Sequence, residues 1–163
     1  MDAEEGAQRT AGNGLMRLAA LAFAFVILAA APSTGNAQTD SSARAREDSA
    51  VRTVVQRYLH GLKFNDTTGL HDAFWPEARL FAIRPNGQIN ELTQAKWYSM
   101  FKASAGKEEQ GDLRIASVDI TGNAAAVKVV EDYPGSRYTD YLNLLRIDGR
   151  WWIVNKIYTM ERR

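Results

Sequence analysis

The apolar residues in the first half of the chain recur at helical spacing. Between Ala43 and Asn65 an apolar side chain returns every three or four residues, which predicts an amphipathic helix with one buried face. That face consists of Val51, Val54, Val55, Tyr58, Leu59 and Leu62.

Two shorter helices follow from capping signals. Asn65-Asp66-Thr67 ends the first helix and predicts a second over Thr68 to Phe74, because short polar side chains accept hydrogen bonds from exposed helical N–H groups. Thr93 predicts a third helix over Gln94 to Ala103 in the same way. Its apolar stripe consists of Trp97, Tyr98 and Phe101.

The second half of the chain changes to the period of a β-strand. A short strand is expected at 79–83, and four longer runs of strand type follow at 113–121, 124–133, 137–146 and 150–160. The turns between these four runs are short, and strands joined by short turns are antiparallel. Helices followed by a meander of strands predict an α+β fold.

The last hairpin can form in two registers. A three-residue loop at 147–149 would pair Asp140 with Lys156 as an exposed ion pair and would bury Trp151, and we favour it for these two reasons. In this register one face of the hairpin points inward, and that face consists of Tyr141, Asn143, Leu145, Trp151, Ile153 and Asn155. A two-residue turn would shift the pairing by one residue and place Leu142, Leu144 and Trp152 differently.

The N-terminus has the pattern of a signal peptide. Leu18 to Ala31 is an unbroken apolar run after Arg17, and Gly35-Asn36-Ala37 favours cleavage before Gln38. The alternative is a membrane helix, which needs about 20 apolar residues. We therefore predict a signal peptide over 1–37, with translation starting at Met16 because the residues before it are acidic. A polar linker over 38–42 and one domain over 43–163 follow, and the protein is expected to be exported, periplasmic or secreted, from a bacterium.

Composition excludes several kinds of chemistry. The chain of 163 residues has no cysteine, which rules out disulfides, thiolate catalysis and cysteine-bound zinc. The formal net charge is +1, which does not favour a nucleic-acid partner. The two histidines, His60 and His71, are not spaced as metal ligands, and we expect neither a metal nor a cofactor.

Two segments resemble a known family. RYTDYLNLLRIDGRWWIVNKIY is similar to the closing hairpin of the putative lumazine-binding family, within the nuclear transport factor 2-like superfamily. VVQRYLHGLKFNDTTGLHDAFWPEARLFAI resembles the first two helices and first strand of that family. The resemblance implies a cone in which a curved antiparallel sheet wraps round three N-terminal helices. It also implies a pocket at the wide end and, in many members, a homodimer formed across the sheet.

The candidate ligand-binding residues come from several elements. The favoured hairpin face contributes Tyr141, Asn143, Trp151 and Asn155. Strand alternation places Glu131 on the inner face with Val127 and Val129, although a salt bridge with Arg137 is the alternative that we favour for it. The predicted helices add Tyr58, His71 and Trp97.

The resemblance also bears on catalysis. Steroid isomerase-like enzymes of the superfamily use a tyrosine of the first helix beside a pocket acid, with a separate aspartate base. Tyr58 has a compatible position, but the strand at 79–83 offers no carboxylate as a base, so we assign no catalytic residue.

These observations leave three hypotheses about function. The first is an exported protein that binds a small molecule, which the aromatic and amide-rich pocket favours. The second is a lyase or isomerase that uses Tyr58 with Glu131 or His71. The third is a structural homodimer that uses the sheet face, with Trp152 exposed on it.

Overall fold

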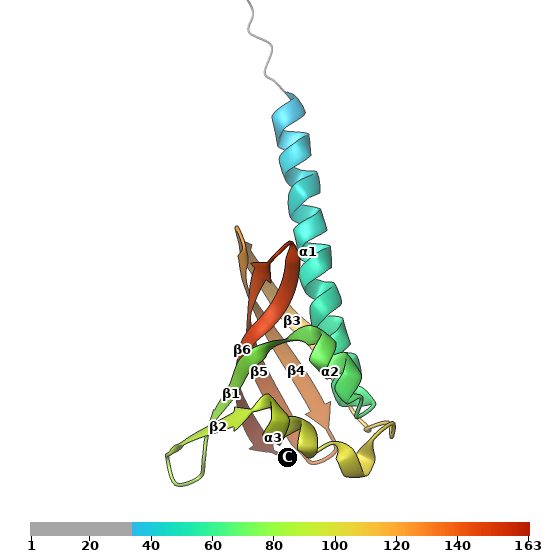
Figure 1. Ribbon diagram of the computed structural model, residues 1–163, viewed down its shortest axis with the longest axis vertical. Helices are drawn as coiled ribbons and strands as arrows, with labels where there is room; N and C mark the ends of the chain where they lie inside the picture. Colours follow the sequence, from blue (N-terminus) through green and yellow to red (C-terminus); the bar gives the residue numbers. More distant parts are fainter. Residues whose placement is uncertain (1–33) are drawn as a thin grey trace, which may run out of the picture. The chain divides into compact units, whose positions relative to one another are not determined.

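The computed structural model describes residues 34–163 (Figure 1). The predicted signal peptide therefore lies mostly outside the described residues. The elements are α1 (Thr34–Lys63), α2 (Thr67–Ala73), β1 (Phe74–Ile83), β2 (Ile89–Thr93), α3 (Gln94–Ser99), the 3-10 helix η1 (Lys102–Ser104), β3 (Asp112–Thr121), β4 (Ala124–Tyr133), β5 (Ser136–Ile147) and β6 (Arg150–Arg162).

Helices α2 and α3 begin at the predicted caps, although α3 ends at Ser99 and not at the predicted Ala103. Asp66 accepts a hydrogen bond from the N–H of Thr68 at the start of α2, and Thr93 accepts one from Lys96 at the start of α3. Helix α1 begins at Thr34, so the segment 38–42, which we predicted as a linker, is helical. None of the described helices has the length and apolar composition that crossing a bilayer requires.

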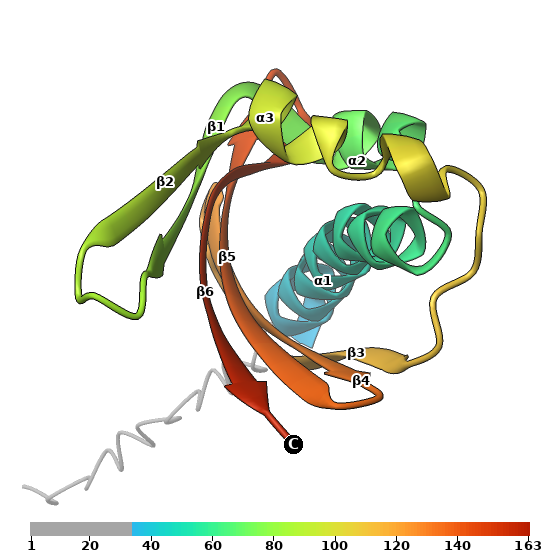
Figure 2. The same ribbon diagram turned by 90° about the horizontal axis from the view of Figure 1, so that it is seen from below.

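Six strands form one curved sheet in the order β2-β1-β6-β5-β4-β3. All neighbours are antiparallel except β1 and β6, which run parallel. The sheet curls round α1 without closing, and α2 and α3 lie across the opening (Figure 2).

The core lies between α1 and the concave face of the sheet. All six residues of the predicted helix face are buried, including Val51, Val55 and Tyr58, which have no exposed surface. They pack against the inner side chains of β4, β5 and β6, among them Val129 and Ile153. Apolar burial of this kind is the main favourable contribution to folding.

The favoured register of the last hairpin is wrong. Ile147 pairs with Arg150 across a two-residue turn, in which Asp148 and Gly149 have φ values of 50° and 79°. Positive φ at both central residues is the geometry that fits the right-handed twist of paired strands, and an Asp-Gly pair adopts it readily. The pairing shifts once more at a bulge after Asn143.

This register reverses the faces of β5. Leu142 and Leu144 point inward and are buried, whereas Tyr141, Asn143 and Leu145 point outward and are exposed. The inner face of β6 is formed by Trp151, Ile153 and Lys156. Trp152 is half-buried against Trp75, with ring centroids 5.8 Å apart, so it is not the exposed residue that we predicted.

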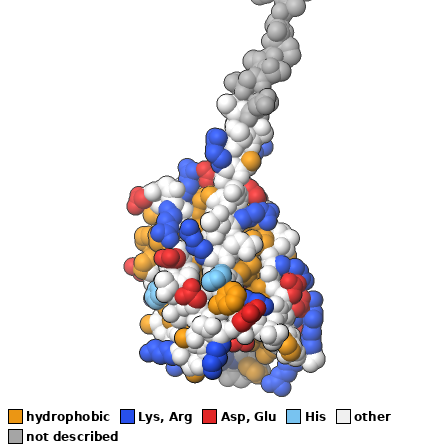
Figure 3. Space-filling view, turned by 90° about the vertical axis from the view of Figure 1, so that its right-hand side faces the viewer, with side chains coloured by type: hydrophobic (Ala, Val, Ile, Leu, Met, Phe, Trp, Pro, Cys, Tyr) orange, Lys and Arg blue, Asp and Glu red, His pale blue; other side chains and the backbone are white. Residues whose placement is uncertain are grey.

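Charged side chains of both signs are interspersed on the face that carries α1 and α2 (Figure 3). This mixture agrees with the net charge of +1. No block of one charge covers the part of that face that the structure describes.

The observed register makes a testable prediction about two neighbouring leucines. Leu144→Ala should lower the free energy of unfolding by about 2–5 kcal/mol, because it leaves a cavity in the core. Leu145→Ala, the matched control, should cost under about 1 kcal/mol, because Leu145 is 42% exposed. Urea denaturation of both variants measures the difference, and a larger loss at Leu145 would favour the rejected register.

Candidate functional site

Four polar side chains meet in the interior, each from a different element. Tyr58 comes from α1, Glu131 from β4, Asp140 from β5 and Lys156 from β6. Each is at most 5% exposed. Burial of two carboxyl groups and an ammonium group is costly unless they pair with one another, so their contacts determine whether this arrangement is stable.

The hydroxyl of Tyr58 is the centre of this cluster, which we call the polar floor. Its oxygen lies 3.0 Å from Glu131 Oε1 and also contacts Asp140 Oδ2. Lys156 Nζ donates to the Tyr58 oxygen and to Asp140 Oδ2, each at 2.7 Å. Lys156 and Asp140 thus form a buried ion pair that Tyr58 bridges to Glu131.

Counting protons shows that one carboxyl group of the polar floor must be neutral. A phenol oxygen accepts hydrogen bonds but has only one proton to donate. Lys156 donates to Tyr58, and the Tyr58 proton can serve either Glu131 or Asp140, not both. The contact of the Tyr58 oxygen with the other carboxyl group is a hydrogen bond only if that group is protonated and donates to Tyr58.

The raised pKa of Glu131 places this proton on Glu131. Burial raises the pKa of Glu131 to about 8, the nearby Lys156 charge opposes this, and the Asp140 charge adds to it. Burial works against the charge of Lys156, but the carboxylates of Asp140 and Glu131 keep its pKa raised. Burial, followed by the same two carboxylates, also raises the pKa of Tyr58 well above its usual value. At neutral pH the polar floor therefore contains neutral Glu131, neutral Tyr58 and the Lys156–Asp140 ion pair.

The polar floor opens into a cavity of about 710 Å³ at the wide end of the sheet. Glu131 and Lys156 line this cone cavity together with Trp97 and Tyr158. Lys156 Nζ lies 4.9–5.3 Å from the ring centroids of Tyr58, Trp97 and Tyr158. An ammonium group has three N–H donors, and the described residues accept only two of those of Lys156. No described residue accepts a hydrogen bond from the third.

Comparison with known protein families identifies the family of this chain. The family model described as "Putative lumazine-binding" matches residues 46–159, which is most of the chain.

The chain belongs to the putative lumazine-binding family.

Solved relatives of this family member share its fold. It is similar to a nuclear transport factor 2-like protein of unknown function from Shewanella baltica OS155, at 28% identity and a TM-score of 0.66, over 72% of this chain and 95% of the other. A similar protein of unknown function from Silicibacter pomeroyi DSS-3 is 24% identical, with a TM-score of 0.65, over 72% and 98% of the two chains. These similarities confirm the predicted nuclear transport factor 2-like α+β fold.

One curated relative has a named activity. Aldolase FrzH from a Cladobotryum species is 22% identical over 113 residues, which cover 69% of this chain and 90% of that protein.

The cone cavity brings together only some of the residues predicted from sequence. The inward orientation of Glu131 is confirmed, and its contact with Tyr58 is one of the two pairings that the enzyme hypothesis named. The alternative salt bridge between Glu131 and Arg137 is wrong, because the Arg137 guanidinium binds Asp132 through Nε, at 2.6 Å. Trp97 lines the same cavity.

Other predicted site residues lie elsewhere. Trp151 is buried away from the cavity lining, with its indole N–H donating to Glu47 at 2.8 Å. Tyr141 and Asn143 are on the outer face of β5, and Asn143 donates to half-buried Asn155 at 3.1 Å. Tyr141, Asn143 and Asn155 were predicted on the inner face because that prediction depended on the wrong turn.

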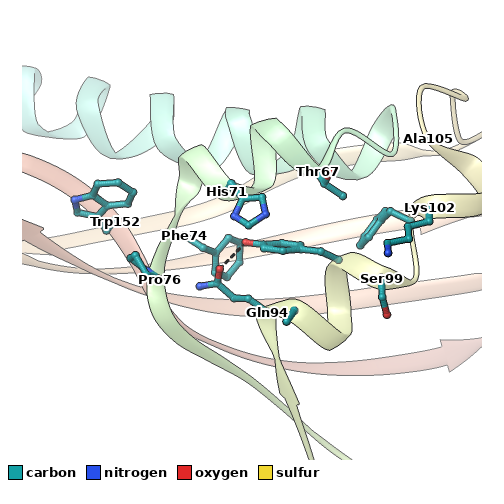
Figure 4. A pocket seen from close by; sticks show the side chains of 12 residues that line it. Thr67, His71, Phe74, Pro76, Gln94, Ser99, Lys102, Ala105 and Trp152 are labelled. Atoms are coloured by element: carbon teal, nitrogen blue, oxygen red, sulfur yellow. Dashed lines mark hydrogen bonds between the residues drawn. The ribbon is translucent and has the colours of Figure 1, made fainter.

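His71 lines a different cleft, of about 740 Å³, beside α2 and α3 (Figure 4). Its ring lies 4.1 Å from that of Tyr98, whose hydroxyl donates to Gln94 at 2.9 Å. Trp152 also lines this outer cleft. The outer cleft has no buried charged group in its lining, so the cone cavity is the stronger candidate site.

Asp140 and Lys156 were recognised in the sequence as a pair but were predicted to be exposed. They are in fact buried, at 0% and 5% exposure, and are diagonal neighbours on the inner face. Elsewhere in residues 34–163, no three His, Cys, Asp or Glu side chains are grouped as metal ligands.

The proton on Glu131 makes the stability of the fold depend on pH. Between pH 4.5 and about 8 folded Glu131 keeps a proton that the unfolded chain loses, so the free energy of unfolding should fall as the pH rises. The steepest fall for one proton is about 1.4 kcal/mol per pH unit. The raised pKa of Lys156 makes the free energy of unfolding depend on pH only above pH 10.5, outside this window. Chemical denaturation at several pH values measures the slope.

Glu131→Gln is the matched variant, because an amide N–H can donate to Tyr58 in place of the acid proton. It should fold and lack this contribution to the slope. Equal slopes in the two proteins would contradict the placement of the proton.

Proposed function

We propose that the protein binds a small organic molecule in the cone cavity, with an oxygen of the ligand accepting a hydrogen bond from Lys156. One observation carries the proposal: a cavity of about 710 Å³ is lined by a buried ammonium group with an N–H that no described residue accepts. This volume falls within the range of known ligand pockets, roughly 300–1,000 Å³.

The cavity lining supports a planar carbonyl compound as the ligand. Trp97 and Tyr158 supply aromatic surface for a flat ring. The third N–H of Lys156 suits a carbonyl oxygen, because an ionised donor makes the stronger kind of hydrogen bond. Glu131 Oε2 has one long contact, 3.4 Å to the Tyr133 hydroxyl, so it can accept from a hydroxyl or amide group of the same ligand.

The tryptophans allow this binding site to be tested directly. Trp97 lines the cone cavity and Trp152 lines the outer cleft, so each indole N–H reports on one of them. Titration with acetophenone, an aryl ketone, should shift the Trp97 indole signal in ¹⁵N–¹H NMR spectra and leave Trp152 unchanged. Lys156→Met should abolish the shift. Because this variant leaves the buried Asp140 carboxylate without its cation, the Asp140→Asn/Lys156→Met double variant, which has no such unpaired charge, is measured beside it.

His71→Trp, which narrows the outer cleft, is the control and should bind acetophenone as the natural chain does. A shift of Trp152 alone would move the site to the outer cleft. No shift of either indole at millimolar acetophenone would reject a carbonyl ligand.

A second candidate function is the enolisation of a carbonyl compound. Two observations favour it: the pKa of Glu131 is near 8, and a curated relative is named as an aldolase. In this reaction the Glu131 carboxylate takes a proton from the carbon beside the carbonyl group. The electron pair of that C–H bond forms the C=C bond of the enolate, and the π pair of the carbonyl group moves to its oxygen, where the Lys156 ammonium group stabilises the charge.

Enolisation can be followed as exchange of the acetophenone methyl protons in D₂O. The rate should rise with pH and level off above about 8, as Glu131 becomes ionised. Glu131→Gln should slow the exchange by roughly 10²–10⁴-fold. Binding without exchange above background would leave the protein as a binding protein.

Two further properties are proposed beside this function. We propose export from a bacterial cell, supported by the apolar run at 18–31, and fractionation of the source cells would test it.

We also propose a homodimer through the outer face of the sheet, where Ile83, Ile89 and Ile157 are 47–68% exposed. A monomeric mass in light scattering at all concentrations would reject the dimer.

A further inference from the structure

The wide end of the cone cavity contains carboxylates and tyrosines that are not members of the polar floor. Glu108 and Glu109 line it from the loop after η1. Tyr133, Tyr138 and Tyr158 line it from β4, β5 and β6. We call Glu109 and these three tyrosines the mouth cluster.

Of the two carboxylates, only Glu108 forms an ion pair with another residue of the described range 34–163. Glu108 pairs with Lys63, at 3.3 Å between Nζ and Oε1. Glu109 Oε1 instead accepts from the neutral Asn65 amide at 2.9 Å, and no ion pair forms at Glu109 within residues 34–163. The backbone N–H of Glu109 donates to the Lys63 carbonyl at 2.7 Å, which holds this part of the loop against the end of α1.

Glu109 and the C-terminal end of α1 place negative charge at the mouth cluster. Burial is the main cause that raises the pKa of Tyr133 well above its usual value, and the carboxyl groups of Glu131, Asp140 and Glu109 raise it further. Helix α1 also ends here, since Asn65 lines the cavity just after Lys63. The C-terminus of a helix carries a partial negative charge, equivalent to roughly half an elementary charge.

The tyrosines of the mouth cluster form a continuous aromatic wall. The ring centroids of Tyr133 and Tyr138 are 6.0 Å apart, and those of Tyr138 and Tyr158 are 6.5 Å apart. Aromatic faces attract cations, and Tyr158 already lies 4.9 Å from the Lys156 ammonium group. Tyrosine faces beside a carboxylate without a cation suit a second ammonium group.

We propose that the ligand of the cone cavity carries a protonated amine, which lies between Glu109 and the tyrosine wall. The inference rests on the proposed function, because the carbonyl group of the same ligand is placed at Lys156. The ligand class is therefore an aryl ketone with an aliphatic amino group at the far end of the ring. The amine interacts with the mouth cluster and the ketone with the polar floor.

Three probes with the same ketone test this inference. They are para-(aminoethyl)acetophenone, which is a cation, para-propylacetophenone, which is neutral, and para-acetylphenylpropanoate, which is an anion. Calorimetric titration of the full chain should give a dissociation constant for the cation that is roughly fivefold to tenfold lower than for the neutral probe. The anion should bind more weakly than both.

Glu109→Gln should remove the advantage of the cation and leave the neutral probe unchanged, because Gln can still accept from Asn65. Glu108→Gln is the matched control and should keep the advantage, since the Glu108 charge is already paired with Lys63.

The outcomes separate this inference from the proposed function. Equal affinities for the cation and the neutral probe would overturn the inference that the ligand carries an amine, and would leave the carbonyl site in place. Tightest binding of the anion would have the same two consequences. An advantage that survives in Glu109→Gln would also overturn it. Failure of all three probes to bind at millimolar concentration would overturn both proposals.

Discussion

The buried ion pair between Lys156 and Asp140 is the interaction on which the rest of the site depends. Taking these two charges out of water costs several kcal/mol each, and only close pairing with added hydrogen bonds offsets that cost. Tyr58 supplies the added bonds, and it lies on α1 while the charges lie on β5 and β6. The cluster therefore joins the helix to the concave face of the sheet at one point.

The same interaction explains why Glu131 keeps its proton. Asp140 already balances the Lys156 charge, so a second carboxylate beside Tyr58 would be buried without a cation of its own. The neutral acid avoids that cost and donates to Tyr58 instead. A carboxyl group poised near neutral pH beside an ammonium group can serve binding or proton transfer, which connects the fold to both candidate functions.

Much of the fold, but less of the site, could be predicted from sequence. The apolar spacing of α1 and the caps at Asp66 and Thr93 are local signals, and each formed as expected. Asp140 and Lys156 were placed outside because the rejected register pairs them directly as an exposed ion pair and buries Trp151, and these features outweighed the Asp-Gly turn signal. A pair of charges is buried only when tertiary structure supplies partners, and Tyr58 lies 82 residues from Asp140 in the chain. No local pattern in the sequence contains that contact.

The most direct test of this account is the titration of the Glu131 carboxyl group by ¹³C NMR, with the signal assigned through its absence in Glu131→Gln. A midpoint near pH 8 would agree with a neutral acid that faces the cone cavity and donates to Tyr58. A midpoint near 4.5, the ordinary value for glutamate, would contradict it. In that case the polar floor would carry two carboxylates at neutral pH, and neither the proton count nor the proposed roles of Glu131 would hold.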